Sequence, residues 1–405
     1  MNTSSNHSSA GPLRGVRILD LATVLAAPFS STLCADLGAE VIKIELPDGN
    51  DSLRGLAPVT PKHALFWKVT NRGKKAISLD IRKPEGKALL LKLLAQSDVL
   101  VENFRSGTLA RWGLDFETLQ RANPKIIVLR LTGFGQTGPY AARPGFARIF
   151  EAMSGFAHLT GEADGPPQHM NYPLGDVVSG VFGAFAIAAA IAEQRGSDTP
   201  EAREIDLSAT EAMLRLLDPL PVEYEHQGIT RERAGSRATY TAPSNMYRSA
   251  DGVWMTLVGS SDAIFKRLAQ AMDMPGLASD PRFANNPLRV QHLEALDGTI
   301  ADWFAARDFD TISAALTQCE VPFSKVYSIK DVMEDPHFQA RKAIIRIPDT
   351  ELGSVPAPCV VPRFSGHEVN IEATGPHTGQ HNGDVYARLG LAAADLDRLK
   401  ADGVI

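Results

Sequence analysis

The sequence predicts an α/β protein built on a mostly parallel sheet, with a smaller α+β unit after it. Short β-rich runs alternate with helical patterns through the first half of the chain. A charged, glycine-containing segment then interrupts the chain near its middle, and a hairpin pattern with two helices follows. Strands that alternate with helices of this length pair in parallel through right-handed crossovers. At 405 residues the chain is also too long for one ordinary core.

Five buried-strand patterns define the first half. They are Val16–Leu21, Glu40–Ile44, Ala76–Asp80, Asp98–Val101 and Ile126–Leu131. Helical patterns lie between them, near Pro28–Leu37 and from Pro84 through Leu94. Ligands bind parallel sheets at the carboxyl ends of the strands. We therefore expect the site among the segments that follow the strands, at residues 22–28, 45–47, 102–104 and 132–139.

The second half begins with a linker pattern at Gln227–Thr241, which is rich in charged residues, Gly and Ser. Beyond it, Asn245–Arg248 and Val253–Val258 form a hairpin pattern around a short turn. Helical patterns follow near Asp262–Met272 and His292–Ala306. These elements predict the smaller α+β unit.

Composition limits the classes of function. The chain is 44% hydrophobic and 22% charged, as expected of a soluble globular protein. A net charge of −6 without a basic cluster argues against nucleic acid. The three cysteines have no metal-like spacing and fit a reducing cytoplasm. Residues 1–10 lack the apolar core of a signal peptide and predict a mobile tail. The apolar run Val177–Ala192 is shorter than a bilayer span, so we expect a packed core helix and no membrane partner.

Asp176 is the most informative single residue. It is a lone carboxylate at the start of the apolar run from Val177, where the free N–H groups and the dipole of a helix favour a negative charge. An ionised carboxylate beside apolar surface is a candidate nucleophile. Asp is also a preferred N-cap residue, so position alone leaves both roles open.

Other polar residues follow or precede the predicted strands. Lys74 and Lys75, with Arg72 beside them, are candidates for holding phosphates, or form a solvated turn. Asn103 and Phe104 combine an amide with an aromatic face, which suits the binding of a flat ring. A loop residue that simply packs into the core is an equally ordinary explanation. Arg111, seven residues later, either reaches the same ligand or forms a surface ion pair. The segment Gly133–Gly138 only approximates a dinucleotide-binding loop, because Pro139 does not suit the start of a phosphate-binding helix.

Together these motifs resemble the class III coenzyme A transferases, the formyl-CoA transferase-like (CaiB/BaiF) family. The motifs that carry the resemblance are Leu13–Leu21, Leu37–Glu45, Asn71–Ser78, Val101–Phe104, Gly133–Gln136, Gly175-Asp176, Asp335-Pro336-His337 and Gly379–Asn382. They occur in the family's order and cover nearly the whole chain after its first dozen residues.

The resemblance implies a Rossmann-like large domain formed by both chain ends, with residues 1–225 and 329–405, and a smaller inserted α+β domain at 226–328. It implies an interlocked homodimer. It also implies that Asp176 is the catalytic aspartate and that coenzyme A is a substrate, with no tightly bound cofactor or metal. The residues implied along the CoA path are Leu25, Ala26, Arg72, Lys74, Lys75, Asn103, Phe104 and Arg111.

The implied reaction moves CoA from an acyl-CoA to a carboxylic acid through a mixed anhydride and an aspartyl-CoA thioester, both formed on Asp176. Two alternatives are an acyl-CoA racemase of the same fold and a non-catalytic acyl-CoA-binding subunit. The racemases carry a His-Asp pair where this chain has Phe146 and Ala147, and Phe146 cannot exchange a proton. A non-catalytic subunit is expected to lack the aspartate, which is present here.

The chain also departs from the formyl-CoA transferases. Residues 237–244 contain none of the glycines that form a lid in those enzymes, and Leu46 stands where some relatives have an arginine that contacts CoA. The sequence at residues 242–245 and 262–265 resembles instead that of the branch of the family that acts on succinyl-CoA and on dicarboxylic acids. A second carboxylate needs a cation, for which Arg148 and Arg237 are candidates. The resemblance also places His381 near the active site.

Overall fold

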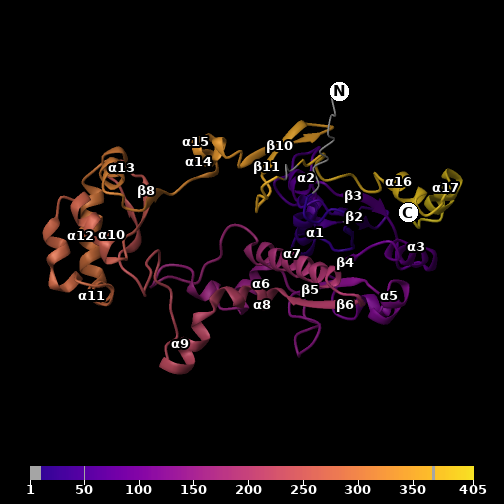
Figure 1. Cartoon of the computed structure of the whole chain (residues 1–405), viewed down its shortest axis with the longest axis horizontal. Helices are drawn as coiled ribbons and strands as arrows, with labels where there is room; N and C mark the ends of the chain where they lie inside the picture. Colours follow the sequence, from indigo (N-terminus) through magenta and orange to yellow (C-terminus); the bar gives the residue numbers. More distant parts are fainter. Residues whose placement is uncertain (1–10, 50, 367–369) are drawn as a thin grey trace. The chain divides into compact units, whose positions relative to one another are not determined.

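The computed structural model describes residues 11–49, 51–366 and 370–405 (Figure 1). They fall into two compact units. The larger unit comprises the described parts of Met1–Phe156, His169–Gln227 and Lys342–Ile405, and the smaller comprises Ala157–Gln168 and Gly228–Arg341. The predicted mobile tail at residues 1–10 lies outside the described residues.

The larger unit is built on a six-stranded parallel sheet with the strand order β3-β2-β1-β4-β5-β6. The strands are β1 (Arg17–Asp20), β2 (Glu40–Glu45), β3 (Lys75–Ser78), β4 (Val99–Glu102), β5 (Ile127–Thr132) and β6 (Arg203–Ser208). This is the doubly wound order of Rossmann folds, in which ligands bind where the order reverses, here between β1 and β4. The mixed α/β class and the parallel sheet predicted from the sequence are confirmed.

The sixth strand was not predicted from the sequence. Most of β6 is exposed or half-buried, and it alternates charged and apolar residues at the edge of the sheet. The other five strands are apolar enough to be recognised, because parallel strands are covered on both faces.

Helices cover both faces of the sheet. The helices of the larger unit are α1 (Ala26–Asp36), α2 (Leu65–Thr70), α3 (Pro84–Leu94), α4 (Thr108–Arg111), α5 (Phe116–Ala122), α6 (Ala147–Met153), α7 (Leu174–Arg195), α8 (Ala209–Leu214), α9 (Pro219–Gln227), α16 (Asn382–Ala387) and α17 (Ala393–Ala401), with short 3-10 turns η1 (Ser52–Gly55) and η3 (Arg215–Leu217). Ile18 and Leu19 are both fully buried and belong to two different core clusters. Successive side chains of a strand point to opposite faces, which explains the division. Ile18 packs in the cluster that includes Ile187 of α7, and Leu19 in the cluster that includes Leu90 of α3.

Helix α7 packs closely on α1 (Figure 1). Two glycines make this possible, because a Cβ on Gly180 would lie 2.7 Å from the carbonyl oxygen of Ala26, and one on Gly183 would lie 2.2 Å from Ser30 Oγ. The helix has 22 residues, so the expected limits of 177–192 were too short and the length argument against a membrane span was wrong. By length and composition α7 can cross a membrane, and 39% of its most apolar window is buried within the structure.

The end of the chain returns to the sheet beside β3. The N–H of Asp80 donates to the carbonyl of Val404 at 2.7 Å, and the hydroxyl of Tyr386 donates to the carbonyl of Ser78 at 2.8 Å. Before these contacts, β10 (Ile344–Asp349) and β11 (Gly353–Pro358) form an antiparallel hairpin. Segments from both halves of the sequence therefore build the larger unit.

The smaller unit has a three-stranded antiparallel sheet and a set of helices. Its elements are η2 (Ala157–Leu159), β7 (Ser244–Arg248), β8 (Trp254–Val258), α10 (Asp262–Ala271), η4 (Pro275–Ser279), η5 (Pro281–Phe283), α11 (Asn286–Gln291), α12 (Leu293–Ala305), α13 (Phe309–Gln318), β9 (Phe323–Lys325), α14 (Ile329–Glu334) and α15 (Pro336–Ala340). The predicted hairpin is β7 and β8, and the two predicted helices are α10 and α12.

The limits of the smaller unit differ from the expected 226–328. It continues to Arg341 and also takes in Ala157–Gln168, a segment from the middle of the larger unit's sequence. Helices α14 and α15 are short, and neither has a buried residue. Their sequences therefore contain no periodic apolar pattern from which these helices could be predicted.

Candidate active site

A pocket of about 220 Å³ lies in the larger unit at the carboxyl ends of β1, β4 and β5. It coincides with the point where the strand order reverses, the position at which doubly wound folds bind ligands. Four segments that are far apart in sequence line it. They are residues 23–26, 103–105, 131–133 and 141–146, together with Phe150 and Asp176.

Asp176 reaches this pocket from the first turn of α7. The N-cap position of the helix is Pro173, so Asp176 is not the cap and that alternative is wrong. Burial, together with the nearby carboxylate of Glu151, raises the pKa of Asp176 to about 7. We expected an ionised group. The structure gives instead a carboxyl whose charged and neutral forms coexist near neutral pH.

Glu151 holds the start of α7 from the neighbouring helix α6. Its side chain is 2% exposed, Oε1 accepts the N–H of Gly175 at 3.0 Å, and Oε2 lies 2.8 Å from Nδ1 of His169. A Cβ on Gly175 would lie 2.7 Å from the carbonyl oxygen of Ala147, so α6 and α7 meet backbone to backbone. The sequence analysis missed Glu151, because nothing in the local pattern shows that it is buried beside Asp176.

Leu25 and Ala26, which are predicted to lie along the CoA path, form another wall of the pocket. They lie at the start of α1, where Leu25 is the N-cap residue and no side chain caps the turn. The first N–H groups of a helix have no partners within the helix and form a ready site for negative charge. This wall can therefore stabilise an anion in the pocket.

Asn103 and Phe104 also line the pocket, but they are engaged by the protein. The Asn103 amide donates to the carbonyl of Thr23 at 2.8 Å and accepts the N–H of Thr23 at the same distance. Phe104 packs edge-on against Trp112 with ring centroids 5.2 Å apart. Asn103 thus fixes the loop after β1, and Phe104 supplies an apolar surface.

Arg72 and Lys74 do not line the pocket, which corrects their expected place beside phosphates. The Arg72 guanidinium is bidentate to Asp36 at 2.9 and 2.6 Å, and both side chains are buried. Lys74 Nζ donates to Asp20 at 2.8 Å and to the carbonyl of Pro28 at 2.7 Å, and the side chain has no exposed surface. Burial lowers the pKa of Lys74 to about 8, against the opposing effect of Asp20. Both cations stabilise the fold beneath the site.

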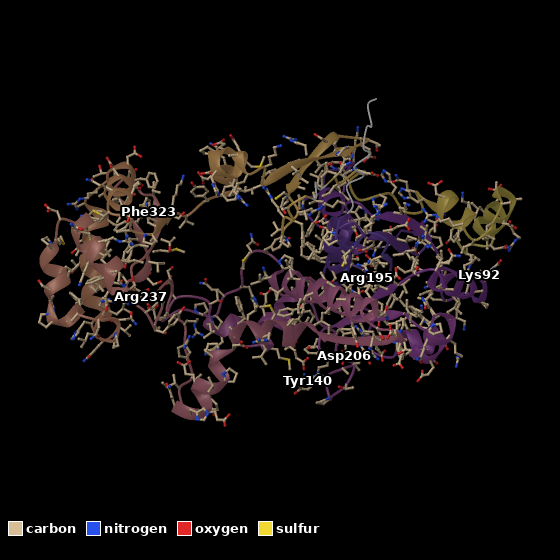
Figure 2. The ribbon with its side chains drawn as sticks, in the orientation of Figure 1. Lys92, Tyr140, Arg195, Asp206, Arg237 and Phe323 are labelled. Atoms are coloured by element: carbon tan, nitrogen blue, oxygen red, sulfur yellow. The ribbon has the colours of Figure 1, made fainter. Side chains whose placement is uncertain are left out.

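The other predicted cations are also outside the pocket lining. Lys75 pairs with Glu40 at 2.6 Å, and Arg111, on the exposed side of α4, donates to Thr108 at 2.9 Å. Arg148 is exposed on α6. Arg237 belongs to the smaller unit, where it pairs with Asp297 at 2.8 Å (Figure 2).

Two arginines that the sequence analysis did not select line the pocket instead, Arg105 and Arg143. The Arg143 guanidinium lies 3.6 Å from the ring centroid of Tyr140, in the loop that leads to α6. Among the described residues, neither arginine has an ion-pair partner within 4.0 Å. Arg105 directly follows Asn103-Phe104, and that adjacency was the available signal.

Thr132 adds a polar group to the lining. It ends β5 and is 8% exposed, and within the described part of the chain its hydroxyl has no hydrogen-bond partner. The neighbouring hydroxyl of Thr210 does have one, because it donates to the carbonyl of Gly133 at 2.8 Å. An unpaired buried hydroxyl is costly, so Thr132 is a group that a ligand can satisfy.

Proton exchange and metal chemistry have little support in the described residues. Phe146 lines the pocket at the position where a racemase histidine was considered. His381 is outside the pocket lining, and its Nδ1 accepts the N–H of Ala76 at 3.0 Å. Over residues 11–49, 51–366 and 370–405, the side chains form no cluster of three or more His, Cys, Asp or Glu able to hold a metal.

Comparison with known proteins agrees with this geometry. Residues 13–382 match the sequence model of CoA-transferase family III. The chain is 41% identical to a succinyl-CoA–D-citramalate CoA-transferase of Chloroflexus aurantiacus, over 97% of this chain and 98% of that protein. It is 34% identical to a succinate–glutarate CoA-transferase of Agrobacterium fabrum, over 93% of this chain and 96% of that protein.

A solved structure shares the fold. The crystal structure of a CAIB/BAIF family protein from Brucella suis matches with a TM-score of 0.82 and 32% sequence identity, covering 94% of this chain and all of that one. The similarity therefore extends over almost the whole length of both chains.

Proposed function

Because the chain belongs to CoA-transferase family III, we propose that it moves CoA from succinyl-CoA or another dicarboxylyl-CoA to a carboxylic acid, with Asp176 as the nucleophile. One observation carries the proposal. Among the described residues, Asp176 is the only carboxylate in the lining of the pocket at the strand-order reversal, and the lining is more apolar than polar. A carboxylate with a raised pKa in such a place is a candidate for covalent chemistry.

In the first half of the reaction, an oxygen of ionised Asp176 attacks the thioester carbonyl of the donor. The C–S bond breaks, CoA leaves as a thiolate, and a mixed anhydride joins Asp176 to the acyl group. The thiolate then attacks Cγ of Asp176. The anhydride C–O bond breaks, the donor acid leaves as a carboxylate, and Asp176 carries CoA as a thioester.

The second half runs the same steps in reverse with the acceptor. Its carboxylate attacks Cγ of the aspartyl thioester, which releases the thiolate and forms a second anhydride. The thiolate attacks the acceptor carbonyl, which yields the new acyl-CoA and free Asp176. Dividing one transfer into such steps is the advantage of covalent catalysis.

Each attack creates an oxyanion, and the start of α1 is the wall suited to stabilise it. Leu25 and Ala26 line the pocket there, and no side chain caps the turn. Backbone N–H groups fixed before the reaction cost nothing to reorganise when the charge develops. Apolar residues such as Phe146 and Phe150 line the same pocket and help to exclude the water that would hydrolyse an anhydride.

The substrate class follows from charge. Arg105 and Arg143 lie in the pocket lining, and an arginine can bind a carboxylate bidentately. We assign the second carboxylate of a dicarboxylic substrate to these residues rather than to Arg148 or Arg237. The names of the relatives support the class, since the proteins from Chloroflexus and Agrobacterium are named for succinyl-CoA or succinate with a dicarboxylic partner.

CoA binds as a substrate and not as a resident cofactor. We place it against Leu25, Ala26 and Phe104, with Lys75 and Arg111 as the remaining candidates for its phosphates. Arg111 is exposed and donates to the hydroxyl of Thr108, a contact that it can exchange for one with an anion.

The functional molecule is proposed to be an interlocked homodimer. Apolar side chains are exposed on adjacent helices of the larger unit. They are Ile149 and Met153 on α6 and Val181 and Phe185 on α7. A second copy of the chain would cover them. The three free cysteines suit a reducing cytoplasm, where we place the protein.

A matrix of donors and acceptors tests the activity. Acetyl-CoA, succinyl-CoA and glutaryl-CoA are each mixed with monocarboxylic and dicarboxylic acids, and new acyl-CoA species are separated and quantified. Transfer restricted to dicarboxylic partners supports the proposal. Racemisation of a 2-methylacyl-CoA without transfer would identify the racemase alternative, and binding without either reaction would identify a non-catalytic subunit.

A further inference from the structure

Val24 has a backbone conformation that its side chain disfavours. Its φ angle is +65°, in the left-handed region that β-branched residues rarely adopt. Val24 lies in the loop between β1 and α1 and lines the pocket that contains Asp176. A residue in this region persists only where the surrounding structure holds it, and such residues cluster at functional sites.

Three side chains from other segments of the larger unit hold this loop by its backbone. Asp51 accepts the N–H of Val24 at 3.1 and 3.3 Å, and Asn103 holds the N–H and carbonyl of Thr23. Lys43 Nζ donates to the carbonyl of Ala22. Three consecutive residues are therefore each tied to a different side chain.

The charged members of this set are buried and paired. Lys43 Nζ lies 3.6 Å from Asp51 Oδ2 and 3.7 Å from Asp20 Oδ1, and the exposed fraction of all three side chains is at most 1%. Asp51 also accepts the N–H of Leu53 at 3.0 Å, so it is fixed by the turn that it caps. Paired charges without solvent hold their geometry better than exposed ones do.

We propose that Asp51 and Lys43 are positioning residues, which hold residues 22–24 in the strained conformation that shapes the acyl-CoA pocket. They act through Val24 and Ala22 and not by contact with the reacting atoms. The proposal rests on the function proposed above and adds to it two positioning residues that are far from Asp176 in sequence. It predicts that loss of Asp51 weakens acyl-CoA binding more than it slows the chemical steps.

The first test compares Asp51→Ala, Asp51→Asn and a control, Asp349→Asn. Asparagine keeps an oxygen that can accept the N–H of Val24, whereas alanine keeps none. Asp349 is equally buried and pairs with Lys68 at 2.6 Å, but it is outside the pocket lining. We expect Asp51→Ala to raise the KM for acyl-CoA about tenfold with kcat changed less than about threefold, and Asp51→Asn to recover most of the loss. Asp349→Asn lowers the thermal midpoint without changing KM.

The second test uses Val24→Gly, because glycine adopts a positive φ without steric cost. In the Val24→Gly background, Asp51→Ala should raise KM less than about threefold. Asp51 also borders a smaller neighbouring hollow, and a direct contact with a ligand there would not be relieved by glycine at position 24. Equal effects of Asp51→Ala in both backgrounds would therefore overturn the proposal, as would an unchanged KM in a folded Asp51→Ala protein.

Calorimetric titration with CoA separates this proposal from the proposed function. If the wild-type protein neither binds CoA nor transfers it, both proposals fail. If the wild-type protein is active and the folded Asp51→Asn and Asp51→Ala variants bind CoA as tightly as it does, only the positioning proposal fails. Weaker binding by Asp51→Ala, recovered by Val24→Gly, supports both.

Discussion

The two walls of the pocket are held in different ways. The wall after β1 stands on buried pairs of opposite charge, Asp51 with Lys43 and Asp20 with Lys74. Burial alone would raise the pKa of Asp20, but Lys43 and Lys74 hold it below its usual value. Among the described residues, the wall at the start of α7 has no such pair for Asp176, and the charged group that acts on the pKa of Asp176 is another carboxylate, Glu151.

This difference separates the paired charges, which shape the site, from Asp176, which is proposed to react in it. A buried charge that is paired stays in place and does not react. Separating it from its partner would leave an uncompensated charge in the low-dielectric interior. An unpaired carboxylate beside apolar surface is destabilised in its charged form and so gains more from forming a neutral ester-like bond. The predictions below test this contrast, beginning with the largest expected effect.

Replacing Asp176 removes the proposed nucleophile. We expect Asp176→Ala and Asp176→Asn to lower kcat on the order of 10⁴-fold, with CoA binding retained. Transfer is measured by the appearance of the second acyl-CoA, and calorimetry checks binding. Transferase activity close to that of the wild type in either variant would remove Asp176 from its central role.

Asp176→Asn should also change the stability of the folded protein in a way that depends on pH. The pKa of Asp176 is raised from 3.8 to about 7, so the folded state holds a proton that the unfolded state loses. Stability therefore falls as the pH rises from about 4 to about 7, and the deficit is complete above that range. Asp176→Asn should raise the thermal midpoint at pH 8 more than at pH 5. An equal change in the thermal midpoint at pH 5 and pH 8 would show that the charge of Asp176 does not destabilise the folded protein.

Glu151→Gln should shift the pH dependence of the reaction. Gln keeps an oxygen for the N–H of Gly175, but it removes the negative charge that raises the pKa of Asp176. Because the proposed reaction needs the carboxylate form, we expect wild-type activity to rise with pH through about 7. In the variant this rise should move to lower pH, measured from kcat/KM between pH 5 and 9. The exposed Glu201→Gln should leave the profile unchanged, and an unmoved profile in Glu151→Gln would contradict the account.

Arg143→Ala and Arg105→Ala should weaken binding of the distal carboxylate. We expect the KM for a dicarboxylic acceptor to rise about tenfold, because a charge-assisted hydrogen bond is worth roughly 1.5–3 kcal/mol, while the KM for CoA changes little. Arg148→Ala is the matched control, since Arg148 is exposed outside the pocket lining. The assignment fails if Arg148→Ala alone changes acceptor kinetics.

Thr132→Val gives the smallest and most selective effect. Valine has a similar shape and lacks the unpaired hydroxyl, so the thermal midpoint should hold or rise while the KM of one substrate increases about threefold. Thr210→Val, which breaks a hydrogen bond to Gly133, should instead lower the midpoint and spare KM. A destabilised Thr132→Val protein with unchanged kinetics would show a purely structural role.

The sheet was predictable because five of its six strands are largely buried and therefore apolar in sequence. The edge strand β6, with its charged residues, gave no such signal. The position of Asp176 in the first turn of α7 was also predictable, because the apolar run begins beside it.

The partners of the charged residues could not be predicted. Lys74 looks like a solvated phosphate ligand in sequence, and only the folded chain brings Asp20, more than fifty residues earlier, against it. Glu151 and Arg143 were missed for the same reason, since burial and pocket lining arise from contacts that are distant in sequence. The local sequence pattern located most of the inner elements and singled out Asp176 as the candidate nucleophile, but it could not distinguish a buried, paired cation from a free one.

Trapping the covalent intermediate tests the central claim most directly. The protein is mixed with succinyl-CoA, treated with hydroxylamine, digested and analysed by mass spectrometry. The account predicts a hydroxamate on Asp176 that forms only with succinyl-CoA and is absent from Asp176→Ala. An active enzyme that carries the label on another residue, or carries none, would contradict it.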